Sequence, residues 1–314
     1  MNNNNYIEAI TKLRKEKNAI ILAHYYQEGE IQDIADFVGD SLGLSQQAAK
    51  TKADIIVFAG VHFMAETAKI ICPEKKVLIP DLMAGCSLAD SCPADIFEKF
   101  VKEHPDHLVI SYVNTTAEIK ALTDIVCTSS NAIEIVESLP KEQKILFGPD
   151  RNLGNYINSI TNRNMLVWDG ACHVHEEFSF ERILELKKAN KDAKIISHPE
   201  CKKPILLISD HIGSTASLLK FVRSDNAKEY IVATESGILH QMQKSCPEKK
   251  FFPAPPIDVT CGCNDCKFMK MINLKKIYDC LENEKPEILI EERLRNKAEK
   301  SIMRMLEISE KLGL

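Results

Sequence analysis

The sequence predicts an α/β protein built from three similar three-layer α/β/α units, each with a parallel sheet, related by a pseudo-threefold axis around a central cavity. Short apolar runs alternate with amphipathic stretches along all 314 residues, and several runs are apolar at consecutive positions. This pattern is expected of parallel strands covered by helices on both faces. Polar residues that follow the runs recur at intervals of 86 to 88 residues, which indicates an internal repeat.

The predicted strands are short apolar runs rich in β-branched residues. These nine runs cover 19–25, 54–60, 76–81, 107–113, 144–149, 164–170, 193–199, 229–235 and 251–257. The amphipathic stretches 87–104, 176–190 and 214–223 lie between them and are predicted as helices. The last stretch, 286–314, has the pattern of one long amphipathic helix, which we expect to pack against the first unit.

The repeat is clearest where strands end. The first strand of each unit runs into a polar tip, and the three tips are His24-Tyr25-Tyr26, Tyr112-Val113-Asn114 and His198-Pro199-Glu200. A small hydroxyl cluster follows about 17 residues later, as Gly39-Asp40-Ser41, Thr128-Ser129-Ser130 and Gly213-Ser214-Thr215. The third strand of each unit leads to Cys86, Cys172 or Cys266. We expect three units: 1–85 completed by 266–314, then 86–171, and then 172–265. The alternative is that the recurrence reflects only the regular alternation of strands and helices found in any α/β protein.

Composition and charge exclude several classes of function. The chain has 40 Lys and Arg against 45 Asp and Glu, and no basic stripe interleaved with aromatic residues, so a nucleic-acid partner is not expected. No apolar segment reaches the ~20 residues of a membrane helix, and the N-terminal stretch lacks the apolar core of a signal peptide. Neither GxxxxGK[ST] nor GxGxxG occurs, which argues against ATP or NAD binding. We therefore expect a cytoplasmic protein that binds small molecules and no membrane.

The cysteines are the strongest chemical signal. The chain has 11 of them, and in a reducing compartment metal ligation explains such a number better than disulfides do. Cys86, Cys172 and Cys266 lie on three distant loops, which suits a 4Fe-4S cluster with three thiolate ligands and one open iron. Such an iron is a Lewis acid for hydroxyl and carbonyl groups. Spacing alone leaves zinc open, because Cys261, Cys263 and Cys266 form a local group of three thiols.

The three candidate ligands are each expected to precede a helix, whose N-terminus stabilises a thiolate. For Cys266 this helix is predicted over 267–281. Other cysteines have no counterpart in the other units and are expected to pack as small buried side chains. They are Cys72, Cys127, Cys201, Cys246 and Cys280, with Cys92 as a weaker case.

The polar tips and hydroxyl clusters predict where substrate binds. The tip residues are expected at the carboxyl ends of parallel strands, where such sheets bind ligands. They are His24, Tyr26, Tyr112, Asn114, His198 and Glu200. Ser41, Ser129, Ser214 and Thr215 are expected at helix starts, where a hydroxyl can cap the helix, bind a phosphate or carboxylate, or do both. His173 is expected to reach the site beside Cys172, whereas His175 is expected outside it.

Twelve motifs in order make the chain resemble the quinolinate synthase family along nearly its whole length. They are AHYYQ (23–27), GDSL (39–42), FAGVHFMAETAKI (58–70), DLMAGCSLADSC (81–92), SYVNTTAEIKA (111–121), CTSSNA (127–132), FGPDRNLG (147–154), WDGACHVHE (168–176), HPEC (198–201), GSTA (213–216), ATESGILHQM (233–242) and CKFMKM (266–271). Lys267-Phe268-Met269 departs from the Pro-Trp-Met that family members often carry, which bears on local packing only.

The resemblance implies an enzyme of NAD biosynthesis that condenses iminoaspartate with dihydroxyacetone phosphate to quinolinate, with loss of phosphate and two waters. It also implies a functional link to L-aspartate oxidase. It assigns Glu200 as general base, Tyr26 as an acid/base group, and Tyr112 and Asn114 as substrate-binding residues. With His198, which could orient a substrate carbonyl or carboxylate, Tyr26, Tyr112 and Glu200 are the predicted catalytic residues. The alternatives are a 4Fe-4S-dependent hydro-lyase acting on another hydroxy acid, and a non-enzymatic redox or iron sensor.

Overall fold

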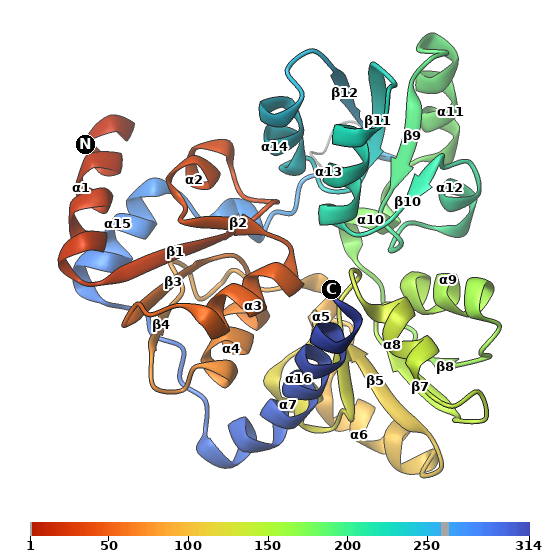
Figure 1. Cartoon of the computed structure of the whole chain (residues 1–314), viewed down its shortest axis with the longest axis horizontal. Coiled ribbons are helices and arrows are strands. Elements are labelled where there is room, and N and C mark those ends of the chain that lie inside the picture. Colours follow the sequence, from red (N-terminus) through yellow and green to blue (C-terminus); the bar gives the residue numbers. More distant parts are fainter. Residues whose placement is uncertain (1, 259–263) are drawn as a thin grey trace.

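Three parallel sheets form the framework of the protein (Figure 1). The structure is a computed structural model and describes residues 2–258 and 264–314. Within these residues each sheet has four strands, in the orders β2-β1-β3-β4, β6-β5-β7-β8 and β10-β9-β11-β12. The predicted α/β class with three similar parallel units is thereby confirmed. In each order the first strand of the unit lies between the second and the third, so the strand order reverses beside the first strand. Sheets of this kind bind ligands beside such a point, at the carboxyl ends of the strands.

The strands of the three sheets occupy equivalent stretches of the chain. The first sheet contains β1 (Ala19–His24), β2 (Phe37–Gly39), β3 (Ile55–Ala59) and β4 (Lys76–Leu78). The second contains β5 (Leu108–Tyr112), β6 (Ile125–Cys127), β7 (Ile145–Gly148) and β8 (Leu166–Val167). The third contains β9 (Lys194–Ser197), β10 (His211–Ile212), β11 (Glu229–Ala233) and β12 (Lys250–Pro253). All nine predicted strands are present, and the pattern missed β2, β6 and β10, which are edge strands.

Helices flank the sheets in the same order as the strands. The first unit carries α1 (Asn3–Glu16), α2 (Gly29–Ile34), α3 (Ser41–Lys50) and α4 (His62–Ile71). The second carries α5 (Ser87–Asp90), α6 (Ala94–Glu103), α7 (Ala117–Ala121), α8 (Ala132–Ser138) and α9 (Arg151–Thr161). The third carries α10 (His173–Glu176), α11 (Phe180–Ala189), α12 (Lys203–Leu207), α13 (Thr215–Ser224) and α14 (Ile238–Ser245). The 3-10 helix η1 (Met269–Met271), α15 (Leu274–Asn283) and α16 (Glu292–Leu312) end the chain.

Two predicted helices are interrupted. The stretch 87–104 divides into α5 and α6, because Pro93 forms the N-cap of α6. The helix predicted over 267–281 is wrong in its first half, since Cys266 is followed by η1 and the α-helix begins only at Leu274, where the Asn273 side chain accepts the N–H of Lys276. The N-terminus of a long helix therefore does not lie beside Cys266.

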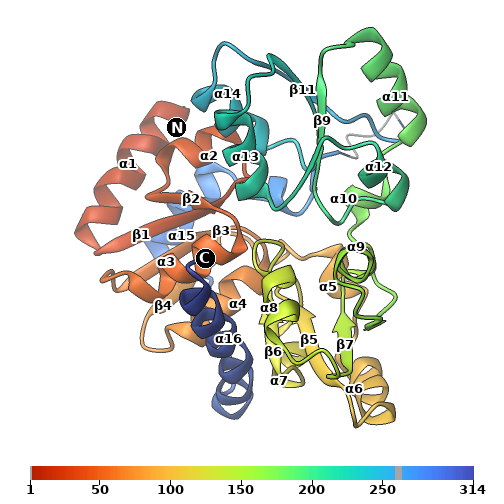
Figure 2. The ribbon, with the colours of Figure 1, turned by 45° about the vertical axis from the view of Figure 1, so that its right-hand side comes forward.

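The C-terminal helices pack on two units. Helix α15 contacts α1 and β3 of the first unit. Helix α16 contacts α4 of the first unit but also α7, β6 and α8 of the second, as Figure 2 shows. Helix α16 therefore lies in the seam between these units rather than on the first alone. The boundaries of the three units stay a prediction.

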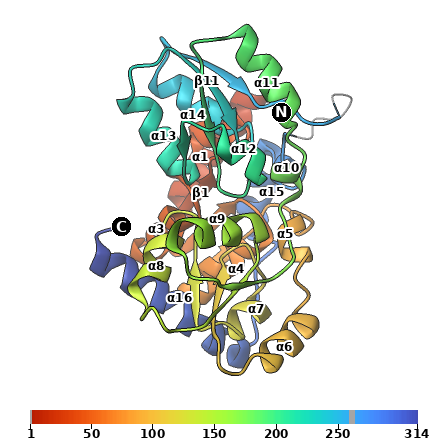
Figure 3. The same cartoon turned by 90° about the vertical axis from the view of Figure 1, so that its right-hand side faces the viewer.

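The hydrophobic core is continuous between the first two units and separate in the third. One buried cluster runs from Ile10 in α1 through the first and second sheets to Met305 in α16. The third unit has clusters of its own around Ile195 and Val232. In Figure 3 this unit forms the upper half of the molecule, and the second unit with α16 forms the lower half. No helix in the described part of the chain is both long and apolar enough to cross a membrane.

Candidate active site

One cavity is lined by residues from all three units. Most of the predicted site residues line it: His24, Tyr26, Ser41, Cys86, Tyr112, Asn114, Ser129, Cys172, His198, Glu200, Thr215 and Cys266. They come together because the carboxyl ends of β1, β5 and β9 face this space. Ser214 and His173 are the predicted residues that do not line the cavity, and Ser214 makes a polar contact beside it.

The three candidate ligand cysteines begin three turns at the cavity. Cys86 is the N-cap of α5, Cys172 is the N-cap of α10, and Cys266 precedes η1. Burial raises the pKa of the Cys86 thiol to about 12, although the nearby N–H group of Ala89 acts in the opposite direction. Burial, and next the charge of Glu200, raise the pKa of Cys172 well above its ordinary value, and burial also raises the pKa of Cys266. Without a bound cation these thiols would stay protonated at neutral pH.

The donor chemistry of this group fits a metal cluster. Cys86 and Cys266 both contribute to the raised pKa of Cys172, so the three sulfur atoms are close enough to interact electrostatically. A cationic cluster compensates the cost of three buried thiolates, and thiolates are the ligands that iron-sulfur clusters prefer. The local zinc alternative involves Cys261 and Cys263, which lie outside the described residues.

A second potential metal-binding group shares one of these cysteines. The ligand atoms of Cys172, His175 and Glu200 lie within 4.8 Å of one another. His175 and Glu200 are, however, already paired with each other and with further side chains. These two residues therefore contact other side chains without a metal. In the described part of the chain, the sulfur atoms of Cys86 and Cys266 form no hydrogen bond with another side chain.

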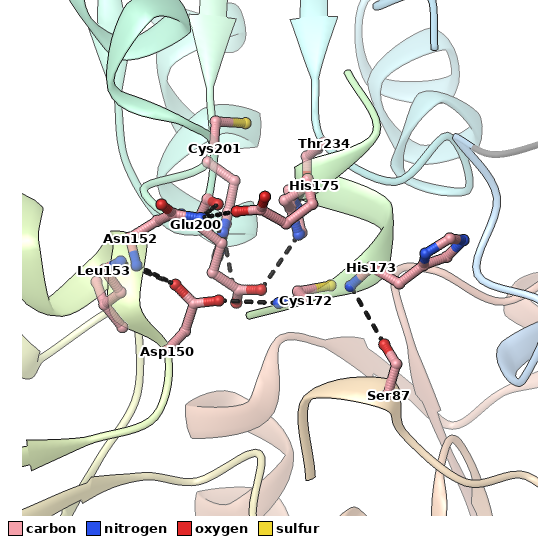
Figure 4. A network of polar contacts seen from close by, with 12 residues as sticks. Ser87, Asp150, Asn152, Leu153, Cys172, His173, His175, Glu200, Cys201 and Thr234 are labelled. Carbon is pink, nitrogen blue, oxygen red and sulfur yellow. Dashed lines mark hydrogen bonds and ion pairs between the residues drawn. The ribbon is translucent and has the colours of Figure 1, made fainter. Parts of the chain in front are cut away.

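Glu200 is the centre of a buried polar network (Figure 4). Its Oε1 accepts a hydrogen bond of 2.7 Å from the hydroxyl of Tyr112, and its Oε2 lies 3.1 Å from Nδ1 of His175. Burial by itself would raise the pKa of Glu200, but His175, His198 and the Tyr112 hydroxyl lower it, and the net direction is downward. Glu200 is therefore a carboxylate at neutral pH.

A row of polar side chains leads from this carboxylate to the first unit. The hydroxyl of Tyr26 lies 2.7 Å from Oγ1 of Thr234 and 3.0 Å from Oγ1 of Thr215. Oγ1 of Thr234 in turn lies 3.1 Å from Nε2 of His175. Because burial, and next the charge of Glu200, raise the pKa of Tyr26 well above its ordinary value, this phenol keeps its proton. Tyr26, Thr234 and His175 are thus joined by hydrogen bonds, and Nδ1 of His175 approaches Oε2 of Glu200 to 3.1 Å without a hydrogen-bond partner of its own.

The predicted roles of two histidines are reversed. His175 is 2% exposed and lines the cavity, so the expectation that it lies outside the site is wrong. The side chain of His173 is exposed, and its backbone N–H donates to Oγ of Ser87 over 3.2 Å. The reason is geometric: in the helical turn after Cys172, the residue three positions on returns to the same face, whereas the next residue points away.

Two further histidines are neutral and oriented by the backbone. Burial lowers the pKa of His24 and of His198 to about 3. Nδ1 of His24 accepts the N–H of Tyr26 over 3.2 Å, and Nδ1 of His198 accepts the N–H of Glu200 over 3.3 Å. Each ring therefore carries its proton on Nε2. Asn114 also lines this space, and its Oδ1 is buried without a hydrogen-bond partner, which indicates a position where a ligand binds.

The three hydroxyl clusters meet beside the cavity. Oγ of Ser130 donates to Oδ2 of Asp40 over 2.5 Å and lies 2.7 Å from Oγ of Ser214, whose hydroxyl can donate to it, so these contacts join all three units. Asp40 caps α3 and Ser214 caps α13. The starts of these helices therefore converge where Ser41, Ser129 and Thr215 line the cavity, and this arrangement suits an anion.

Two buried carboxyl groups hold the cysteine loops and were not predicted. Oε1 of Glu235 accepts the N–H of Cys266 over 3.1 Å, and burial raises the pKa of Glu235 to about 7 despite the nearby Lys270. Oδ2 of Asp150 accepts the N–H of Cys172 over 2.9 Å, while its Oδ1 accepts the N–H of Asn152 and so caps α9 (Figure 4). The Asp-Arg-Asn start of α9 is a recognisable N-cap signal, whereas nothing in the sequence marks Glu235.

The other cysteines in the described part of the chain are buried, as predicted. Cys72, Cys92, Cys127, Cys201, Cys246 and Cys280 are all buried. Among them, Cys127 and Cys280 pack within the main hydrophobic cluster.

Comparisons with known proteins agree on one family. The model of the family described as quinolinate synthetase A protein matches residues 8–307. A quinolinate synthase of Thermosynechococcus vestitus is 58% identical over 96% of this chain and 95% of the relative. A quinolinate synthase of Synechocystis sp. is 59% identical over 96% of this chain and 95% of the relative, and one of Nostoc punctiforme is 58% identical over 96% and 93%.

Proposed function

The chain belongs to the quinolinate synthetase A family, and we propose that it condenses iminoaspartate with dihydroxyacetone phosphate to quinolinate, with loss of phosphate and two waters. It is thus an enzyme of NAD biosynthesis. The observation that carries the proposed reaction is the single cavity that gathers three cysteines, a carboxylate and two protonated phenols from three units. Because iminoaspartate is the oxidation product of aspartate, we further propose a functional link to L-aspartate oxidase. We also propose a cytoplasmic location.

We propose that Cys86, Cys172 and Cys266 hold a 4Fe-4S cluster in which one iron has no protein ligand. When bound, such a cluster supplies a Lewis acid that polarises hydroxyl and carbonyl groups. The proposal is supported by the raised pKa values of three thiols that interact with one another and that only a cation would keep ionised. The partners of His175 and Glu200 favour this set of ligands over the group of Cys172, His175 and Glu200.

Glu200 is the proposed general base. Ring formation requires protons to leave carbon, and Glu200 is an ionised carboxylate that lines the cavity. Tyr112 and His175 hold its two oxygens in place. His198, fixed by the backbone with its proton on Nε2, is proposed to orient a substrate carbonyl or carboxylate. A carboxylate in a fixed position next to the reacting carbon is the arrangement that general base catalysis needs.

Tyr26 is the proposed acid/base partner of Glu200. Hydroxide leaves as water only if a proton reaches it, and the phenol of Tyr26 keeps its proton at neutral pH. The hydrogen bonds from Tyr26 to Thr234 and from Thr234 to His175, with the 3.1 Å approach of His175 to Glu200, support a return path for that proton. A base and an acid connected in this way can act in successive steps of one reaction.

The anionic groups of the substrates are proposed to bind to hydroxyl and N–H donors. Among the residues that line the described cavity there is no lysine or arginine, so a phosphate and two carboxylates must be held by neutral donors together with the cluster. Ser41, Ser129 and Thr215 supply hydroxyls near converging helix starts, with Ser214 holding one of these starts in place. His24, Tyr112 and Asn114 complete the proposed substrate contacts from the strand tips.

The function is tested directly by product analysis. The protein is purified without oxygen, its iron and sulfide are measured, and dihydroxyacetone phosphate is added with iminoaspartate generated in the assay from aspartate. We expect a product with the mass and ultraviolet spectrum of quinolinate and one phosphate released for each quinolinate formed. A cluster-replete protein that forms no quinolinate would overturn the proposal, and formation of a different dehydration product would favour the hydro-lyase alternative.

Replacing Tyr26 with phenylalanine tests the acid/base role. We expect kcat to fall by about 100-fold because the hydroxyl at the end of the proton path is lost, while the ring still packs. Steady-state kinetics of the cluster-replete variant provide the measurement. Tyr25→Phe is the matched control, since Tyr25 lies on the same tip but packs against the separate cluster around Val232. Equal rates in the two variants would contradict the role of Tyr26.

A further inference from the structure

The strand tips of the first two units are held by the same device. In the first unit, Nε2 of Gln32 lies 2.9 Å from the carbonyl oxygen of Tyr25 and 2.8 Å from that of Gln27, and it also lies 2.9 Å from the carbonyl oxygen of Gly237, so its two hydrogens are shared among three acceptors. These carbonyls lie immediately before and after Tyr26. Gln32 is 3% exposed and is the fourth residue of α2. One buried side chain therefore fixes the backbone on both sides of a residue that lines the cavity.

The second unit repeats this arrangement with a different side chain. Nζ of Lys120 donates to the carbonyl of Val113 over 2.9 Å and also to the carbonyl of Thr115. These two carbonyls flank Asn114, whose Oδ1 is buried without a partner. Lys120 is fully buried and is the fourth residue of α7, so it occupies the position in its unit that Gln32 occupies in α2. The two residues are 88 apart, which is the interval between the tips themselves.

The third unit lacks this device. The residue at the equivalent position, 86 residues after Lys120, is Leu206. The residue that corresponds to Tyr26 and Asn114 is Glu200, and its carbonyl instead accepts a hydrogen bond of 3.0 Å from Nδ2 of Asn152 in α9. A neighbouring unit thus holds this tip. The contrast shows that the fold itself does not require a polar side chain at this position.

A buried lysine is costly unless its ammonium group is fully engaged. Nζ of Lys120 satisfies two backbone carbonyls and lies 5.4 Å from the ring centre of Phe63, which lines the cavity. An apolar residue here would leave the carbonyl of Thr115 without its donor, while the carbonyl of Val113 would keep only the N–H of Thr115, which donates to it over 2.8 Å. The backbone around Asn114 would then turn to find another partner for the Thr115 carbonyl. The side chain of Asn114 would then leave its present direction.

We propose that Lys120 is a positioning residue for the reaction, which clamps the backbone on both sides of Asn114 and so directs its amide into the cavity, as Gln32 does for Tyr26. The inference rests on the proposed role of Asn114 in substrate binding. Lys120 does not touch the substrate in this scheme. It determines how accurately the Asn114 amide is placed for substrate binding. A displacement of a group in an active site by about 1 Å costs on the order of 100-fold in rate.

The test compares three substitutions in the cluster-replete enzyme. Lys120→Met keeps an unbranched side chain only one atom shorter and removes its donors. Lys120→Gln supplies the amide that does the same work in the first unit. Lys249→Met is the matched control, because Lys249 is also buried, donates from Nζ to the carbonyls of Val222 and Asp225 over 2.5 Å and 2.6 Å, and does not line the cavity.

The measurements are the affinity for quinolinate by anaerobic calorimetry, kcat and KM for dihydroxyacetone phosphate, the midpoint of thermal unfolding, and iron per chain. We expect Lys120→Met to lose about 10-fold to 100-fold in quinolinate affinity and in kcat/KM while it keeps its iron. Lys120→Gln should recover most of that loss. Lys249→Met should unfold at a lower temperature yet bind quinolinate as the parent does.

Each outcome discriminates. A folded Lys120→Met variant with the affinity and kcat/KM of the parent would overturn the clamp, and so would equal losses in the Met and Gln variants. If Lys120→Met does not fold, Gln32→Met tests the same device in the first unit, where a fall in kcat is expected through Tyr26 and an unchanged kcat would overturn it. An Asn114→Ala variant that binds quinolinate normally would refute the proposed role of Asn114, whereas a loss in Asn114→Ala without a loss in Lys120→Met would refute the clamp alone.

Discussion

Replacing Cys86, Cys172 or Cys266 with alanine is expected to give a folded chain that retains no 4Fe-4S cluster and forms no quinolinate. Each cysteine is the proposed thiolate ligand of one iron, and a cubane that loses one of three protein ligands has a second iron without an anchor. Iron and sulfide per chain after anaerobic reconstitution give the measurement, with circular dichroism to establish that the chain is folded. All three variants should lose the cluster to the same extent.

Cys127→Ala and Cys280→Ala are the matched controls. Both side chains are buried in the main hydrophobic cluster, so these variants should lose some stability and keep their iron. A His175→Gln variant separates the two potential metal-binding groups. If a metal were held by Cys172, His175 and Glu200, iron would be lost in His175→Gln and retained in Cys86→Ala. Retention of the cluster in Cys86→Ala would therefore contradict the three-cysteine assignment.

The central strands of each sheet could be predicted because their pattern is set by burial. β3, β5 and β7 are buried almost throughout, and a strand covered on both faces must be apolar at consecutive positions. The edge strands β2, β6 and β10 have two or three residues each, which is too few for any periodicity. Their conformation is fixed by hydrogen bonds to β1, β5 and β9, so their own residues carry little of the signal.

The strand tips could be predicted for a related reason. Equivalent positions in a repeat take equivalent places, and the carboxyl ends of parallel strands are where ligands bind. The offsets of 88 and 86 residues therefore grouped Tyr26, Asn114 and Glu200 before any contact was known. The same spacing extends to Gln32 and Lys120, but their function became visible only from the carbonyls that they contact.

The contacts between units could not be predicted from the sequence. The hydrogen bond from Tyr26 to Thr234 joins residues 208 positions apart and depends on how the first and third units dock. The hydrogen bond between the Cys266 N–H and Glu235, 31 positions apart, likewise depends on tertiary packing. The error over His173 and His175 was avoidable, because α10 is a helical turn and its periodicity already indicated which histidine shares a face with Cys172.

Replacing Glu200 with glutamine is expected to lower kcat by roughly 10² to 10⁴ while the fold and the cluster are retained, because general acid-base groups contribute rate factors of this size. The amide has the shape of the carboxylate but cannot take up a proton at neutral pH. Its oxygen can still accept the hydrogen bond that Oε1 receives from Tyr112 over 2.7 Å. Turnover is measured with enzyme of known iron content, so that a loss of cluster is not mistaken for a loss of chemistry.

The control for this substitution is Glu176→Gln. Glu176 lies on α10, close to the same network, where its Oε2 pairs with Arg151 over 3.1 Å and its Oε1 accepts from Asn152 over 2.6 Å, but it does not line the cavity. Removing its charge weakens an ion pair and leaves the proposed base in place, so turnover per cluster should be close to that of the parent. If Glu200→Gln were as active as Glu176→Gln at equal iron content, Glu200 could not be the base. The chemistry would then have to start from another group in the cavity, with Tyr26 and its path through Thr234 and His175 as the next to test.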